Sequence, residues 1–168
     1  MFAQSLVEQL IDKCPVARLG QTDVRGHAQV LPFVFARAGG ALWSPIDGKP
    51  KKNSELDRLT WVAEHPDVCV LIDHYSEDWS SLWWLKLFCR AVVYRTHHAD
   101  WDEASRALAI KYPQYAETPM FFGNPTMIRF EIDSWKSWAA GGESRVQQWL
   151  SDNSELAGSN SDHGAPIA

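Results

Sequence analysis

The sequence is poor in cysteine, in basic residues and in long apolar runs. It has three cysteines among 168 residues, with no Cys-x-x-Cys spacing, so neither a disulfide framework nor a zinc site is indicated. Lysine and arginine number 16 against 21 acidic residues, for a net charge of -5, whereas a general nucleic-acid-binding protein needs a broad basic face. No run approaches the roughly 20 apolar residues of a membrane span. We therefore expect a small anionic ligand, with neither nucleic acid nor membrane as partner.

Several familiar signatures are missing as well. The sequence contains no G-x-G-x-x-G, no triphosphate P-loop spacing and no G-x-S-x-G serine elbow. The N-terminal segment MFAQSLVEQLIDKC carries Gln, Glu and Asp within its apolar pattern, which is not typical of a signal peptide, and we expect a cytoplasmic protein. The loop sequence DHYSED could hold a metal through Asp73, His74, Glu77 and Asp78, but a hydrated loop with ion pairs is the favoured interpretation.

The apolar pattern predicts an α+β chain of six strands and two or three helices. Strands are expected at about 16–21, 28–37, 41–46, 67–75, 82–96 and 126–139. Helices are expected at about 3–12, 54–65 and 99–112. Because the strands come as hairpins with helices between them, we predict an antiparallel barrel with flanking helices. The domain spans 1–140, and 141–168 has the composition of a polar, disordered tail.

Positive charge is concentrated at one turn, DGKPKKNS, just before the helix that begins near Ser54. The unpaired N–H groups and the dipole of a helix N-terminus favour a phosphate there, and Lys49, Lys51 and Lys52 add charge. Ser44 and Ser54 are possible hydroxyl donors. A solvated surface turn explains the same residues, so the turn alone does not decide. The nine tryptophans suit a core, a dimer interface or a stacking pocket equally well.

The order of these motifs resembles the split-barrel flavin-binding superfamily of pyridoxamine 5′-phosphate oxidase. The segments DGKPK, DHYSEDWSSLWW and IRFEIDSWKSWAA are similar to the branch of oxidoreductases that use the deazaflavin coenzyme F-420, and the match covers about 15–140. The resemblance implies a six-stranded split barrel, a homodimer and a cofactor buried between the subunits.

The resemblance also implies the cofactor-binding residues. The cofactor phosphate lies at Lys49, Lys51 and Lys52 with Ser44 nearby, and the ring lies against Val30, Leu31 and Pro32. The pocket or dimer walls are Trp79, Trp83 and Trp138. No catalytic side chain is named, because the cofactor performs the hydride chemistry.

Three functions remain open from the sequence. The first is hydride transfer between F-420 and a small organic acceptor, and the second is the same fold loaded with FMN. The third is a non-catalytic flavin or haem carrier. Haem needs an axial ligand, and none of the six histidines is expected on the strands that line the cofactor site.

Overall fold

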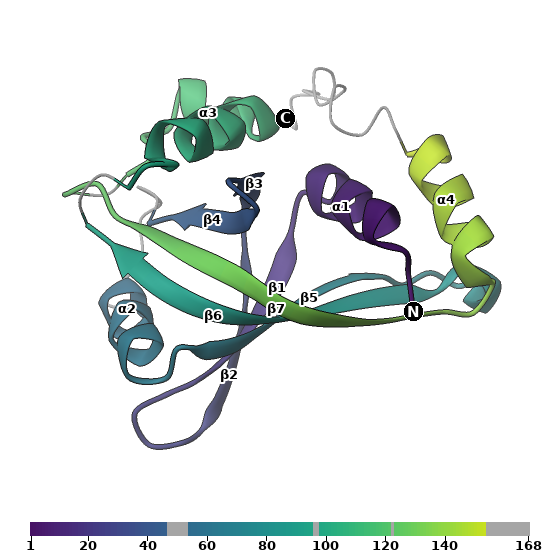
Figure 1. The fold of residues 1–168 in the computed structure, drawn as a ribbon, viewed down its shortest axis with the longest axis horizontal. Helices are drawn as coiled ribbons and strands as arrows, with labels where there is room; N and C mark the ends of the chain where they lie inside the picture. The colour runs from purple at the N-terminus through teal and green to yellow at the C-terminus, as the bar shows by residue number, and fades with distance from the viewer. Residues whose placement is uncertain (47–53, 96–97, 122, 154–168) are drawn as a thin grey trace, which may run out of the picture.

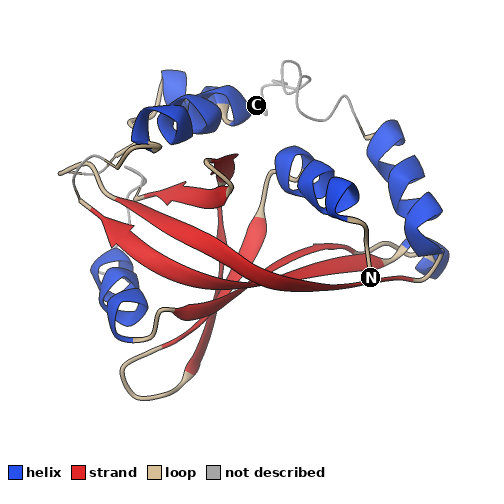
Figure 2. Cartoon of the chain, in the orientation of Figure 1, coloured by secondary structure: helices blue, strands red, loops and turns tan. Residues whose placement is uncertain are grey.

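A computed structural model describes residues 1–46, 54–95, 98–121 and 123–153 of the chain. The Lys49, Lys51 and Lys52 cluster lies outside the described residues. The described part is an antiparallel sheet with four α-helices packed around it (Figures 1 and 2). The helices are α1 (Gln4–Lys13), α2 (Ser54–Glu64), α3 (Trp101–Lys111) and α4 (Gly142–Asp152), with short 3-10 turns η1 (Trp79–Ser81) and η2 (Pro113–Ala116). In this part of the chain no helix is both long and apolar enough to span a membrane.

The sheet has seven strands where the sequence predicted six. They are β1 (Ala17–Thr22), β2 (Ala28–Phe33), β3 (Ala36–Ala38), β4 (Ala41–Pro45), β5 (Asp67–His74), β6 (Trp83–Tyr94) and β7 (Met127–Ala139). Their order across the sheet is β2-β1-β5-β6-β7-β4-β3, and the pairs are antiparallel. The other strand predictions are confirmed to within about two residues. The prediction of one strand over 28–37 is wrong, because the chain breaks at Val34 and Phe35.

Tyr112 supplies the physical reason for this break. Its hydroxyl accepts a hydrogen bond from the Phe35 N–H at 2.9 Å, and its single proton is shared between the Phe35 carbonyl at 2.8 Å and the Pro15 carbonyl at 2.9 Å. The backbone groups of Phe35 are therefore satisfied by a side chain instead of a neighbouring strand. Residues on either side of the break join different strands, β1 and β4.

The break also decides the shape of the sheet. β2 and β3 are its two edges, yet only Val34 and Phe35 separate them in sequence. Two residues span about 10 Å at most, so the two edges meet at this corner and the sheet curls around its inner face. Large apolar side chains fill that face, among them the fully buried Phe35, Leu42, Leu87 and Phe130.

Helix α1 closes the curled sheet. Leu6, Leu10 and Ile11 recur at helical spacing and are almost fully buried in the main core, which confirms the amphipathic helix predicted there. A second, smaller core lies under α3, where Trp43 of β4 packs with Trp101 and Leu108.

Helix α4 corrects the predicted tail. Residues 142–152 are helical, and Val146 and Leu150 are buried in the main core. The polar composition of this segment reflects its solvent-facing side, while Val146, Trp149 and Leu150 form a narrow apolar stripe at helical spacing. The prediction of a disordered tail from residue 141 is therefore wrong for this helix, and its remainder from residue 154 lies outside the described residues.

Alternation along β5 and β6 leaves one face of the sheet outside the core. Val70 and Ile72 point inward, whereas Leu71 and Asp73, which alternate with them, are half-buried on the other side. We call this side the outer face. Its exposed apolar side chains include Val30 on β2, Phe88 on β6 and Trp138 on β7, which are 70%, 36% and 48% exposed.

Candidate functional site

A pocket of about 420 Å³ opens on the outer face where β5 ends, β6 begins and β7 ends. It is lined by Leu71, Asp73, His74, Tyr75, Leu82, Trp83, Trp84, Lys86 and Trp138. This volume is at the lower end of the range of small-molecule sites, and the lining is largely aromatic, as is usual for such sites. Among the described residues no group of three metal-ligating side chains lies close enough together to hold an ion.

Two tryptophans form the walls of this pocket. Trp84 of β6 lies directly opposite Trp138 of β7 in the register, and both side chains are on the outer face. Directly opposed aromatic residues in an antiparallel pair lie close enough for their rings to interact. The ammonium of Lys86 lies 5.5 Å from the centre of the Trp84 ring. The wall therefore combines flat apolar surface with a positive charge.

A β-bulge sets this pairing. Phe88 lies opposite Ser134, but the next residue, Cys89, lies opposite Ile132, so Asp133 is an extra residue in β7. A bulge inserts one residue into one strand and re-aims the side chains beyond it. Trp138, rather than its neighbour Ser137, is thereby placed opposite Trp84 on the outer face.

The loop between β5 and β6 is held by its own short polar residues. The Asp78 carboxylate accepts hydrogen bonds from the Ser80 N–H at 3.0 Å and the Ser80 hydroxyl at 2.7 Å, and these bonds lower the pKa of Asp78. Arg145 of α4 contacts the same carboxylate at 3.3 Å. A Cβ on Gly141 would lie 2.9 Å from the Ser80 carbonyl oxygen, so a glycine lets α4 approach this loop. Trp79 is carried on the loop and is 70% exposed.

Trp83 differs from the other two predicted tryptophans. It belongs to the pocket lining, yet its side chain is only 2% exposed and packs into the main core. Its ring lies 5.0 Å from that of Trp149 and 6.2 Å from that of His74. Its indole Nε1–H has no hydrogen-bond partner among the described residues, which is uncommon for a buried indole.

The residues predicted to contact the ring lie on the edge strand β2. Val30 and Pro32 are exposed on the outer face, opposite Gly20 and Arg18, and Leu31 between them packs against the main core. A proline fits an edge strand because it has no N–H to donate to a neighbour. Two of these three residues are therefore available to a ligand, and the third supports them.

Ser44 lies at the other end of the long β6–β7 ribbon. It is 2% exposed in β4, opposite Ile128, and the N–H of nearby Ile46 donates to the Thr126 carbonyl at 3.0 Å. Trp138 lies eleven positions beyond Met127 along β7, a span of about 36 Å at roughly 3.3 Å per residue, and Met127 is opposite Pro45. Figure 1 shows β4 and α2 at one end of this ribbon and α4 at the other. A single chain therefore does not bring Ser44 and Trp138 together.

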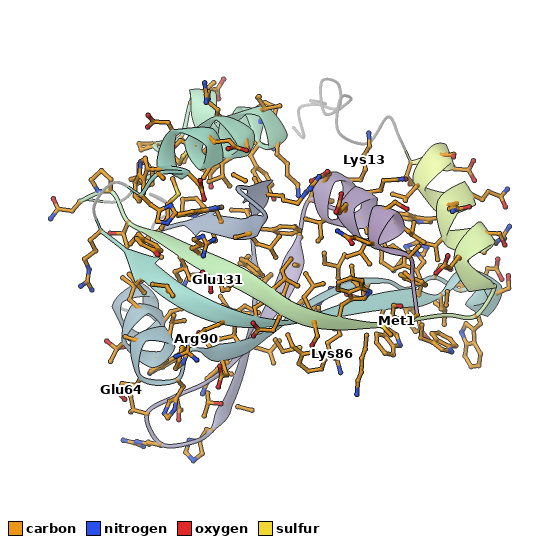
Figure 3. All side chains as sticks on the ribbon, in the orientation of Figure 1. Met1, Lys13, Glu64, Lys86, Arg90 and Glu131 are labelled. Carbon is orange, nitrogen blue, oxygen red and sulfur yellow. The ribbon has the colours of Figure 1, made fainter. Side chains whose placement is uncertain are left out.

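Charges on the outer face are partly neutralised. Asp73 pairs with Arg18 across β5 and β1, and Asp67 pairs with Arg90 at 3.6 Å. Lys86, by contrast, has an aromatic partner in Trp84. Figure 3 shows Lys86 on the side of the β6–β7 ribbon opposite to α1 and α4. The pocket consequently presents one ammonium group that is available to an anion.

Sequence reasoning missed Trp84 and Lys86. The signal was present in LWWLKLFCR, where strand alternation separates Trp83 and Leu85 from Trp84 and Lys86. The first pair points into the core and the second pair to the outer face. Leu71 lies in a continuous apolar run of the sequence, and only the structure places it on the outer face, between the buried Val70 and Ile72.

Comparison with known proteins gives the fold. No family model matches the chain, and no curated protein matches it by sequence. Among solved structures, a conserved hypothetical protein from Mycobacterium tuberculosis superposes with a TM-score of 0.65 at 10% identity, covering 100% of this chain and 96% of that one.

Two further solved structures carry a binding description. The haem storage protein HutZ from Vibrio cholerae has a TM-score of 0.64 at 9% identity, over 83% of this chain and 95% of that one. An FAD-binding protein from Mesorhizobium loti has a TM-score of 0.60 at 15% identity, over 82% and 92%. The chain therefore has an α+β fold, built on a mainly antiparallel sheet, that it shares with flavin-binding and haem-binding proteins.

Proposed function

We propose that this chain binds a flavin-type cofactor on a split-barrel scaffold and is an oxidoreductase. In this proposal it transfers a hydride between FMN or the deazaflavin F-420 and a small organic acceptor. The observation that carries the proposal is the outer-face pocket, in which Trp84, Trp138 and Lys86 offer flat aromatic walls and one cation. These groups fit a planar conjugated ring with an electron-rich or anionic edge.

The site is proposed to be completed by a second copy of the chain. The expected phosphate site follows Ile46, about 36 Å along the β7 strand from Trp138, so one cofactor cannot reach both in the same chain. If two copies pack outer face to outer face with their long strands reversed, the pocket of one copy lies beside the β4 end of the other. Exposed Val30, Phe88 and Trp138 on that face support such a homodimer.

Each part of the chain has a separate role in this proposal. The bound flavin or deazaflavin supplies the hydride chemistry. Trp138 holds the cofactor ring, Trp84 excludes water, Lys86 attracts negative charge, and Val30 and Pro32 of β2 provide apolar contact. No acid or base is assigned, because Asp73 is already paired with Arg18.

Two titrations of cofactor-free protein test the proposal, one with FMN and one with F-420, followed by tryptophan fluorescence. Tight binding of either cofactor supports it and selects between the two. Trp138→Ala should weaken binding by about tenfold, the usual worth of one aromatic stacking contact. Ile110→Ala is the matched control, since Ile110 is 81% exposed on α3, outside the pocket lining. Binding of neither cofactor at micromolar concentration would refute the proposal.

Haem is the second candidate, and a specific observation favours it. Contrary to the expectation from sequence, one histidine does lie at the pocket: His74 ends β5 and belongs to the lining. Its ring also packs against Trp83 and Trp149, at 6.2 and 5.1 Å between centroids. Haemin titration of the parent and of His74→Ala separates the candidates. A defined Soret band that is lost in His74→Ala would replace the flavin proposal with haem binding.

A further inference from the structure

Two lysines lie directly opposite each other on the outer face, near the pocket end of the β6–β7 ribbon. Lys86 of β6 and Lys136 of β7 are cross-strand partners in the register, and both belong to the outer-facing set of residues. Opposed residues of an antiparallel pair have Cβ atoms about 5 Å apart, and like charges in this arrangement are destabilising. A sheet that places two ammonium groups here gives up stability at a position where any neutral polar residue would be acceptable.

No carboxylate relieves this repulsion within the described part of the chain. Asp73 and Asp67 of the neighbouring strand β5 are engaged by Arg18 and Arg90. The partners of the two lysines are aromatic rings. Lys86 lies 5.5 Å from the centre of the Trp84 ring, and Lys136 lies 6.0 Å from that of Phe88. Glu131 of β7 is likewise engaged, by Arg129, so within the described residues the two lysines have no carboxylate partner.

The positions of the rings define a cradle. Trp84 and Phe88 lie on β6, two residues before and two residues after Lys86, so the two lysines lean away from each other toward opposite ends of the cradle. The pocket bounded by Trp84, Trp138 and Leu71 opens beside Lys86. Flat apolar walls next to two cations without carboxylate partners are complementary to a flat molecule with a negative charge.

We infer that the Lys86–Lys136 pair and the Trp84–Trp138 wall bind a planar, conjugated carboxylate or phosphate, which is the substrate class of this protein. This inference rests on the proposed function only in treating the bound anion as the substrate. The binding itself requires no cofactor. The ligand's anionic group lies between the two ammonium groups, where it removes their repulsion, and its conjugated ring lies against the Trp84 indole, next to the cofactor ring that Trp138 holds in the proposed function.

A pair of matched probes tests this inference on the full-length protein. 2-Naphthoate and 2-naphthamide share one ring system and differ in charge, and binding of each is measured by calorimetry. The parent should bind 2-naphthoate about tenfold more tightly, as expected for charge-assisted contacts. Raising NaCl from 50 to 500 mM should reduce this preference, because an exposed charge pair is screened by salt. Equal affinities for the two probes would overturn the inference.

Variants identify the residues responsible. Lys86→Met and Lys136→Met keep the length of the side chains and remove the charge, so each should reduce the preference and the double variant should abolish it. Arg90→Met is the control, since Arg90 is on the same face but already pairs with Asp67. A preference that survives in the double variant contradicts the inference. A double variant that alters the oligomeric state in light scattering, and leaves the preference for 2-naphthoate unchanged, also contradicts the inference. In that case the lysines would bind a second copy of the chain. FMN titration of the same samples reports the proposed function separately.

Discussion

Replacement of Tyr112 by phenylalanine tests how the curled sheet is held at its corner. The substitution keeps the ring, which packs under α3, and deletes only the hydroxyl. The hydrogen bond from the Phe35 N–H disappears, and so does the one donated by the hydroxyl proton, which the Phe35 and Pro15 carbonyls share. Phe35 is fully buried, so water cannot replace the lost partner without opening the core.

The magnitude follows from the groups that are left unpaired. A buried donor or acceptor without a partner costs about 1–3 kcal/mol, and Phe35 loses both its donor and its acceptor contact. We expect Tyr112→Phe to lower the free energy of unfolding by about 2–4 kcal/mol. For a chain of this size, that loss lowers the Tm by roughly 4–16 °C. Few substitutions that remove a single oxygen atom are expected to have so large an effect.

Urea denaturation at pH 7, followed by tryptophan fluorescence, measures this loss. Tyr94→Phe is the matched control: the Tyr94 ring packs against Trp43 at 5.7 Å, but within the described residues its hydroxyl makes no hydrogen bond. The control should stay within about 0.5 kcal/mol of the parent. If Tyr112→Phe is also within that limit, the hydroxyl does not hold the corner, and the account of the β2–β3 break is wrong.

Three further predictions concern burial and charge elsewhere. Burial lowers the pKa of Lys111 to about 8, so the native state loses this proton at a lower pH than the unfolded state does. Between pH 7 and pH 9 the free energy of unfolding of the parent should therefore rise by about 1 kcal/mol relative to that of Lys111→Met, as measured by urea titrations. An unchanged difference would contradict a buried ammonium. Val146→Ala, which truncates a buried side chain of α4, should lower the free energy of unfolding by about 1–2.5 kcal/mol in urea, whereas a surface helix without core contacts would lose almost nothing. Val30→Asp should convert the proposed homodimer to monomer in light scattering, with Ile110→Asp on α3 as control. A dimer that persists in Val30→Asp would place the interface elsewhere.

Much of the fold could be predicted because the pattern of apolar residues within each segment indicates whether it is a strand or a helix. The alternation of Ile128 and Phe130 with Arg129 and Glu131 and the helical spacing of Leu6, Leu10 and Ile11 are visible in the sequence, and both match the structure. The continuous apolar run of β5 suggested burial on both faces, but only one of its faces is fully buried. The break at Phe35 was not predictable from local pattern, because it depends on Tyr112, 77 residues away. Helix α4 was missed because three apolar residues in a polar segment are a weak signal next to the composition of the whole tail.

The candidate site was predicted less well, for a related reason. Trp138 was assigned to the cofactor site, and the structure does place it at the pocket, but its partner Trp84 depends on the register of β6 against β7. Register across strands that are separated by 32 residues cannot be read from either strand alone. The lysine turn at 49–52 and the expected cofactor contacts of Val30, Leu31, Pro32 and Ser44 remain predictions.

The extra residue Asp133 has a consequence for how this chain can vary. Before it, Ile128 and Phe130 of β7 face the core, and after it the inward positions are those of Trp135, Ser137 and Ala139. Deletion of Asp133 would move every later residue of β7 to the other face of the sheet, turning Lys136 and Trp138 inward and Trp135 outward. The length of β7 is therefore under a constraint that its composition does not reveal. Substitution at Asp133 should be tolerated, whereas loss of one residue there would exchange the wall of the pocket with the lining of the core.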